Sequence, residues 1–264
     1  MPTRRSFIAL LACLAPLLAA QGEPVKPPAK EKFAIYLLMG QSNMAGRDTH
    51  DLAEQKDEPR ILALNPEGQW LVARDPIHPK DGRTVPGVGP GISFAHEMLK
   101  SAPGTSIGLV PCAVGGTPLR RWVKGGDLYE AAVKRAKAAA KDGEIKGVLW
   151  HQGESDSIKK EDADIYEQRL TKMLGDLRSD LGQPDLPVVV GQLGDFLALT
   201  PEKYPQLETV RAAIKRIPSV VPHTGYADAK GLEHKGDKLH FNADAARELG
   251  SRFAKAMTEL QKKP

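Results

Sequence analysis

Four apolar runs constrain the fold of this chain more than any other feature of its sequence. They are Phe33–Met39, Ile107–Ala113, Gly147–Trp150 and Val188–Leu193, and Gly225–Asp228 is a shorter candidate for a fifth. None of the four alternates between polar and apolar residues, so strands formed by them must be buried on both faces. This pattern is typical of a parallel sheet with helices on either side.

Apolar residues recur at helical spacing in the intervals between these runs. The predicted helices are Ile92–Lys100, a helix capped by Asp127 that runs to Ala140, Ile165–Leu181 closed by Gly182 and Pro184, Leu207–Ile217 ended by Pro218, and a last helix beginning at Asn242. Strands that alternate with helices predict an α/β fold, here a three-layer α/β/α sandwich with a mostly parallel five-stranded sheet.

Residues 47–90 interrupt this alternation. They contain many Gly, Pro and charged residues and show little periodicity. We therefore expect an irregular insertion that, together with residues 194–204, forms the rim of a site.

The first 20 residues have the pattern of a secretory signal peptide. Arg4 and Arg5 precede the apolar stretch Phe7–Leu18, which is too short for a stable membrane span, and small residues follow it. We expect an exported protein, periplasmic or secreted. The paired arginines also fit twin-arginine export, and the segment before Cys13 weakly resembles a lipoprotein cleavage site. Residues 21–32 contain three prolines and alternating charges, which predicts a flexible linker before one domain over residues 33–264.

Charge and cysteine content narrow the class of protein further. The formal net charge is +4, and loss of residues 1–20, which carry two arginines and no acid, lowers it to +2. This charge, without a basic stripe, argues against a nucleic-acid partner. Cys13 and Cys112 are the two cysteines, and Cys13 lies in the signal, so the mature chain cannot form an internal disulfide.

Polar residues directly follow three of the predicted strands. Ser42 lies just after the first, Gly115 and Gly116 after the second, and Gln152 after the third. Ligands of open parallel sheets bind beyond the carboxyl ends of the strands. We therefore expect these residues to converge at one edge of the sheet.

Asp237 and His240 form an Asp-x-x-His pair just before the last predicted helix. A neutral imidazole can take a proton from a serine and return it to a leaving alcohol, while a carboxylate fixes its tautomer. We predict Ser42 as the nucleophile, His240 as the general base and Asp237 as its orienting group. Taken singly, Ser42 fits a helix N-cap and Asp237 a solvated turn residue.

An acyl-transfer site also needs hydrogen-bond donors for the oxyanion of its tetrahedral intermediate. The candidates are the backbone N–H of Ser42, the backbone N–H of Gly115 or Gly116, and the side-chain amide of Gln152.

Five motifs, in their order along the chain, resemble a known family. They are Gly-Gln-Ser-Asn-Met at 40–44, Gly-Pro-Gly-Ile-Ser-Phe at 89–94, Val-Gly-Gly-Thr at 114–117, Trp-His-Gln-Gly-Glu-Ser-Asp at 150–156 and Asp-x-x-His-Phe at 237–241. Together they resemble the sialate O-acetylesterase and acetylxylan esterase branch of the SGNH hydrolases (carbohydrate esterase family six), over nearly the whole mature chain.

This resemblance implies a flavodoxin-like sandwich, the SGNH hydrolase fold. It implies a triad of Ser42, Asp237 and His240, with Ser42, Gly115 and Gln152 in the oxyanion hole. The Gly-x-Asn-Asp block of the wider superfamily is absent, and Gln152 is taken to replace its asparagine. The choice between Gly115 and Gly116 stays open.

The resemblance also implies a serine esterase that removes O-acetyl groups from carbohydrates, such as acetylated xylan or sialic acid, through an acetyl-enzyme. We expect an acetylated oligo- or polysaccharide as the partner and no cofactor. Two alternatives are a non-catalytic carbohydrate-binding protein on the same fold and a different short-chain acyl hydrolase.

Further residues near the motifs are candidates for contacts with the substrate. They are Asn43, Arg47, Gly116, His151 and Glu154. Arg47 is suited to sugar hydroxyls. His151 and Glu154 could hold Gln152, touch the substrate, or only satisfy backbone groups of the loop.

A zinc site is the competing interpretation of the C-terminal histidines. Five potential ligands lie within 18 residues of one another: His223, Asp228, His234, Asp237 and His240. Their spacing matches no compact zinc motif, and a metal on His240 would leave Ser42 without a base. We therefore expect no metal.

Overall fold

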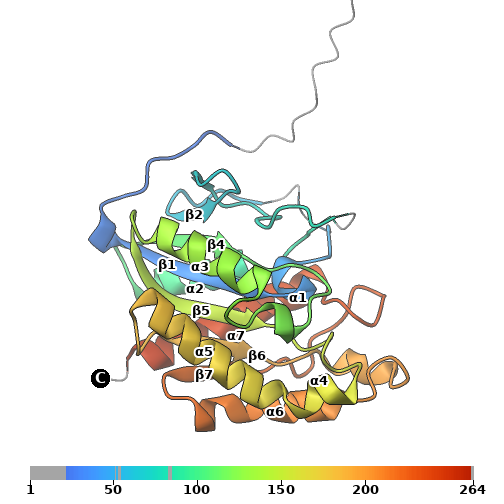
Figure 1. Ribbon diagram of the computed structural model, residues 1–264. Helices are drawn as coiled ribbons and strands as arrows, with labels where there is room; N and C mark the ends of the chain where they lie inside the picture. Colours follow the sequence, from blue (N-terminus) through green and yellow to red (C-terminus); the bar gives the residue numbers. More distant parts are fainter. Residues whose placement is uncertain (1–21, 51, 53–54, 83–84, 263–264) are drawn as a thin grey trace, which may run out of the picture.

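The computed structural model describes residues 22–50, 52, 55–82 and 85–262, and its centre is a seven-stranded sheet (Figure 1). The strands are β1 (Phe33–Gly40), β2 (Ile61–Leu64), β3 (Trp70–Val72), β4 (Ser106–Pro111), β5 (Glu144–His151), β6 (Val188–Gly191) and β7 (Thr224–Ala227). Their order is β3-β2-β4-β1-β5-β6-β7, and neighbouring strands are parallel except for the β2–β3 pair.

The predicted α/β sandwich is confirmed, but the predicted count of five strands is wrong. The five expected strands form the block β4-β1-β5-β6-β7, which has the flavodoxin-like order. β2 and β3 extend the sheet beyond β4 and come from the 47–90 region that we expected to be irregular. They have four and three residues and lie among Gly, Pro and charged residues, which hid the short apolar run Ile61–Leu64. Burial of Ile61, Leu62 and Trp70 against the core stabilises both strands.

Helices cover both faces of the sheet. α2 (Gly91–Ser101) and α7 (Ala243–Gln261) pack together on one face, while α3 (Asp127–Ala139), α5 (Tyr166–Leu181) and α6 (Leu207–Val220) cover the other. In Figure 1, α3 and α5 lie in front of the sheet, and α2 and α7 lie behind it. The shorter elements are η1 (Lys30–Lys32), α1 (Ser42–Ala45), η3 (Leu119–Arg121), α4 (Lys160–Asp164) and η4 (Asp195–Leu199).

Two predicted helix ends are confirmed and two are wrong. Asn242 caps α7 by accepting a backbone N–H at 2.8 Å, and Gly182 closes α5 in the left-handed conformation. Gly126 instead takes the cap position, and Asp127 is the first residue inside α3, where its carboxylate pairs with Arg121. α6 continues past Pro218 to Val220, since a proline in the last turn removes only one backbone hydrogen bond.

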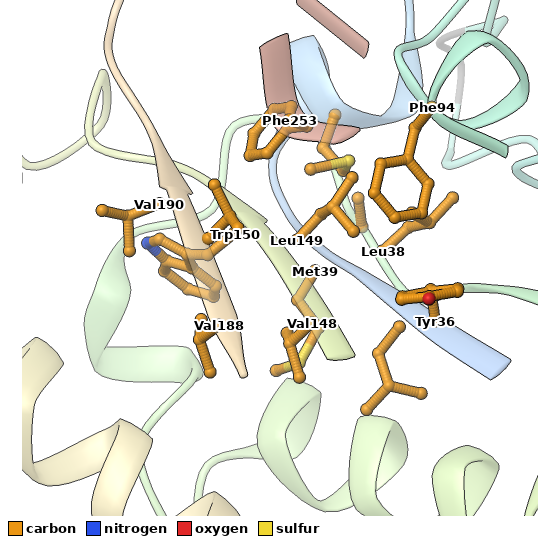
Figure 2. Close-up of a cluster of buried hydrophobic side chains, with 14 of the residues drawn as sticks. Tyr36, Leu38, Met39, Phe94, Val148, Leu149, Trp150, Val188, Val190 and Phe253 are labelled. Atoms are coloured by element: carbon orange, nitrogen blue, oxygen red, sulfur yellow. The ribbon is translucent and has the colours of Figure 1, made fainter. Parts of the chain in front are cut away.

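The absence of polar alternation in the strands reflects a core on both sides of the sheet (Figure 2). Every residue of β1 is buried. Tyr36 packs edge-on against Phe94 of α2 with ring centroids 4.8 Å apart. On β5, Trp150 packs in the same way against Trp122 at 5.5 Å. This two-sided packing fixes the register of the strands and therefore the positions of the loops that follow them.

The predicted signal peptide, residues 1–20, lies outside the described residues. Residues 22–29 have no regular secondary structure, and the Val25 N–H donates to the Trp70 carbonyl at 2.7 Å. The linker over 21–32 and the single domain over 33–264 remain predictions. Within the described ranges, no helix has the length and apolar character needed to cross a membrane.

Candidate active site

A pocket of about 400 Å³ opens where several segments meet beyond the carboxyl ends of the strands. These segments follow β1, β4 and β5 and precede α7. The residues that line the pocket are Gln41, Ser42, Arg47, Gly115, Gly116, Glu154, Ser155, Ile158, Tyr204, Leu239 and His240. Of the residues that we expected to converge at one edge of the sheet, Ser42, Gly115 and Gly116 line this pocket, whereas Gln152 does not.

Ser42, His240 and Asp237 form a continuous hydrogen-bonded chain in this pocket. The Ser42 Oγ lies 3.1 Å from the His240 Nε2, although the residues are 198 positions apart. The His240 Nδ1 lies 2.7 Å from the Asp237 Oδ2. Because a carboxylate only accepts, Nδ1 carries the proton and Nε2 is free to accept the serine hydroxyl. The helix N-cap is Gln41, so Ser42 is not the cap residue that it could have been.

Asp237 is held both by the backbone and by the imidazole. Its Oδ1 accepts the N–H groups of Leu239 at 2.9 Å and His240 at 2.8 Å. Burial alone would raise the pKa of Asp237, but these bonds and the bond to the His240 ring outweigh it and hold the pKa below its usual value. The carboxylate is therefore charged and already oriented toward the imidazole.

Gly40 brings the serine loop against β5. Its φ of +133° is disfavoured for other residues, and a Cβ on it would lie 2.0 Å from the His151 carbonyl oxygen. The next N–H, from Gln41, donates to that same carbonyl at 2.9 Å. This contact fixes the point at which the chain leaves β1 and enters the turn that carries Ser42.

Gly115 and Gly116 both border the pocket, but the Gly115 N–H already has a partner. It donates at 2.6 Å to the Oδ2 of Asp81, which also accepts from the Arg47 guanidinium at 3.1 Å. The Arg47 side chain is only 5% exposed, and it also donates to the Gly46 carbonyl at 2.7 Å. Beside Gly116 there is open space.

The structure does not bring the Gln152 amide to the pocket. Gln152 is fully buried, and its Nε2 lies 2.6 Å from the Asp156 Oδ2, 3.1 Å from the Thr117 carbonyl and 3.2 Å from the Gln41 Oε1. The same Asp156 oxygen accepts the Leu119 N–H at 2.9 Å, whereas its other oxygen has no hydrogen-bond partner. Burial raises the pKa of Asp156 to about 6. The Gln152 amide is thus used for hydrogen bonds within the loops that surround the pocket.

Three other predicted contact residues form a buried polar group beside the pocket. The Asn43 amide bonds to the Glu154 carboxylate at 2.6 Å, and the His151 Nε2 bonds to the Gln192 carbonyl at 3.0 Å. Burial lowers the pKa of His151, so its ring is neutral. The proton lies on Nε2, because the Gln192 carbonyl can only accept. Of these three, only Glu154 lines the pocket.

The five potential zinc ligands do not converge. His223 pairs with Asp185 at 3.1 Å, and His240 pairs with Asp237. His234 accepts the Gly236 N–H through its Nδ1 at 2.9 Å. In the part of the chain that the structure describes, no group of three or more His, Cys, Asp and Glu side chains is arranged to hold a metal ion.

The chain matches a known protein family over most of its length. The family model described as carbohydrate esterase, sialic acid-specific acetylesterase, matches residues 32–259. The chain belongs to this family. The predicted resemblance to the SGNH hydrolase esterases is thereby confirmed, and the protein is a carboxylic ester hydrolase.

The relatives of this carbohydrate esterase agree in sequence and in fold. It is 37% identical over 243 residues to the probable carbohydrate esterase At4g34215 of Arabidopsis thaliana. This match covers 84% of this chain and 89% of the relative. The crystal structure of that protein superposes with a TM-score of 0.77 at 36% identity, over 86% of this chain and 98% of the other. NanS shares the fold with a TM-score of 0.68 at 19% identity, over 90% and 100% of the two chains. A carbohydrate acetylesterase from Xanthomonas citri shares the fold with a TM-score of 0.65 at 22% identity. That match covers 86% of this chain and 56% of the other.

Sequence reasoning missed several residues of this esterase pocket. Tyr204 lines the pocket and Asp81 bonds to Gly115 beside it; both lie inside the predicted rim segments, where nothing distinguished them. Ile158 is 49% exposed and lines the pocket, and its neighbours in the sequence give no sign of this. Leu239 lies next to His240 and could have been inferred from that position alone.

Proposed function

We propose that this carbohydrate esterase removes O-acetyl groups from sugars with Ser42 as the nucleophile. The observation that carries the proposal is the 3.1 Å approach of the Ser42 Oγ to the His240 Nε2, with Asp237 on the opposite ring nitrogen. A hydroxyl within hydrogen-bond reach of a carboxylate-oriented imidazole has the geometry of an activated nucleophile.

The reaction proceeds through an acetyl-enzyme. The Ser42 oxygen bonds to the acetyl carbon while its proton moves to the His240 Nε2. The bond from that carbon to the sugar oxygen then breaks, and the sugar oxygen takes the proton from His240. Water repeats the sequence on the acetyl-enzyme, which releases acetate and restores the free hydroxyl.

The oxyanion of the intermediate is proposed to bind the backbone N–H groups of Ser42 and Gly115. The acyl oxygen would take the place that the Asp81 Oδ2 holds at Gly115 in the free enzyme. A donor that already holds an anionic oxygen at 2.6 Å is suited to the negative charge of an oxyanion. Gln152 becomes a third donor only if its amide turns away from Asp156.

The substrate is proposed to be an acetylated oligo- or polysaccharide of the xylan or sialic acid type, met outside the cytoplasm after export. The family description and the names of the relatives support a carbohydrate acetyl ester. The pocket, of about 400 Å³, has room for an acetyl group and part of a sugar ring. Arg47, Glu154 and Ser155 place polar groups along its wall.

The test compares Ser42→Ala and His240→Ala with the wild type for acetate release from a panel of acetylated glycans. Loss of either residue should lower kcat by about 10⁴–10⁶. A Ser42→Ala protein that releases acetate as fast as the wild type would disprove the mechanism. Thermal melting of each variant checks that the fold is intact, and activity in excess EDTA should equal that without it. A series of nitrophenyl esters should show a maximum at acetate, whereas a maximum at octanoate would point to a different acyl substrate.

A further inference from the structure

The Asn43 side chain connects the turn that carries the nucleophile to the segment that carries the base. Its Nδ2 donates to the Leu239 carbonyl at 3.1 Å, and its Oδ1 accepts the Phe241 N–H at 3.1 Å. These two backbone groups lie on either side of His240. The amide therefore holds the main chain immediately before and immediately after the imidazole.

Glu154 fixes the orientation of that amide. Its Oε1 accepts from the Asn43 Nδ2 at 2.6 Å, and its side chain is 2% exposed. The two amide protons of Asn43 thus meet two acceptors, Glu154 and the Leu239 carbonyl, while the amide oxygen meets the Phe241 N–H. Two donors and one acceptor in a single plane is what a primary amide supplies. A carboxylate or an apolar group of the same size cannot make the three bonds.

Few other polar contacts place His240 relative to Ser42. Within the segment, the Lys235 N–H donates to the His240 carbonyl and the Asn242 N–H to the Glu233 carbonyl. These bonds shape residues 233–242 but do not attach them to β1. The next anchors along the chain are the ring of Phe241, packed on Phe196 and His151, and the Ala243 N–H on Asp48.

We propose that Asn43, oriented by Glu154, is a positioning residue that holds the His240 imidazole within proton-transfer reach of Ser42. Asn43 adjoins the nucleophile in α1, so one turn of helix carries both the hydroxyl and the group that places its base. Asn43 does not line the pocket, which separates this role from the substrate contact that we expected from the sequence. The proposal rests on the proposed function, because it requires His240 to act on Ser42.

The first test is Asn43→Ala, with Asn65→Ala as a matched control. Asn65 is another buried asparagine, and its side chain bonds to Gln69 at 3.1 and 2.7 Å in the β2–β3 hairpin, away from the pocket. Asn43→Ala should lower kcat by about 10²–10³, in line with the loss of an aligned catalytic contact, and change KM by less than about threefold. The rate at which a fluorophosphonate labels Ser42 should fall in parallel with kcat. Asn65→Ala should keep both rates while losing thermal stability.

A second pair of variants keeps the test valid if Asn43→Ala does not fold. Glu154→Gln retains an oxygen for the Asn43 amide and should keep at least about tenfold more kcat and fluorophosphonate reactivity than Glu154→Leu. Glu154→Leu removes the acceptor and should lose kcat and the fluorophosphonate rate together.

The proposal is overturned if Asn43→Ala or Glu154→Leu labels Ser42 at the wild-type rate. It is also overturned if Asn65→Ala loses as much kcat as Asn43→Ala for the same drop in melting temperature. These results differ from failure of the proposed function, in which Ser42→Ala itself would stay active.

Discussion

Replacement of Asp237 by asparagine separates the electrical role of this residue from its structural role. The Oδ1 of Asp237 accepts two backbone N–H groups that shape the turn, and an asparagine oxygen can accept the same two bonds. Only the Oδ2, which faces the His240 Nδ1 at 2.7 Å, becomes an NH₂ group. We therefore expect Asp237→Asn to fold with nearly the stability of the wild type and to lose most of its activity.

Two effects set the size of the loss. A carboxylate about 4 Å from an imidazolium contributes about 4 kcal/mol at an effective dielectric constant of 20 and about 1 kcal/mol in water. The Asp237 side chain is 37% exposed, so we take about 2 kcal/mol after screening by solvent. The new NH₂ donates to Nδ1 and leaves a proton on Nε2, which then cannot accept from Ser42. Restoring the other tautomer forfeits a hydrogen bond, about 1–3 kcal/mol. Together these effects predict a fall in kcat of about 10²–10⁴.

The assay is the initial rate of acetate release from nitrophenyl acetate and from an acetylated xylooligosaccharide, from pH 5 to 9. Because the pKa of Asp237 lies below its usual value, the wild-type carboxylate stays charged over this whole range. A rate for Asp237→Asn within tenfold of the wild type at every pH would refute the reasoning, as would a collapse of the melting temperature. Asp237→Ala, which also removes the two backbone bonds, should lose more stability than Asp237→Asn.

Two further predictions concern stability. Burial raises the pKa of Asp156 to about 6 in the folded state. Between about pH 4 and 6 the folded protein therefore binds more protons than the unfolded chain. Its free energy of unfolding should fall by up to about 3 kcal/mol as the pH rises through this range. Asp156→Asn, with its oxygen in the bonded position, should lack this dependence in denaturant titrations; parallel pH curves for the two proteins would contradict it. Gly40→Ala should lose more than about 4 kcal/mol or fail to fold, because its Cβ would meet the His151 carbonyl oxygen at 2.0 Å. In α5, a Cβ on Gly175 would meet no atom within 4 Å, so Gly175→Ala should instead raise the free energy of unfolding by about 0.5–1 kcal/mol. Equal effects of the two changes would show that the close contact at Gly40 is not decisive.

The sequence predicted those features that depend on local pattern. The five predicted strands follow from apolar runs, and the Asp237–His240 contact follows from a spacing of three residues. The convergence of Ser42 with Gly115 and Gly116 also followed, because parallel strands deliver their carboxyl ends to one edge. The meeting of Ser42 with His240 was predicted instead from the chemistry of a serine, histidine and aspartate triad and from the family resemblance.

Features that depend on a particular long-range contact were not predictable. β2 and β3 are short and lie among Gly, Pro and charged residues, and packing on the core stabilises them, with the Phe33 and Trp70 rings 4.7 Å apart. Asp81 reaches Gly115 from inside the insertion, where many charged residues looked equivalent. Gln152 was expected at the oxyanion, yet its amide points to Asp156 four residues later. For Gln152 the motif located the backbone correctly, whereas the side chain bonded to groups that the fold brings near it.

The geometry of the site therefore has two physical origins that respond differently to change. Asp237 and His240 belong to one short segment, so their contact survives any movement of that segment as a unit. Ser42 and His240 meet only because β1 and the segment before α7 are held together, and the Asn43 amide makes that attachment at 3.1 Å on both sides of the base. A perturbation that loosens residues 233–242 without unfolding them would leave the imidazole oriented but out of reach of the hydroxyl. The distance between nucleophile and base, rather than the orientation of the base, is thus the part of the site most exposed to structural change elsewhere in the protein.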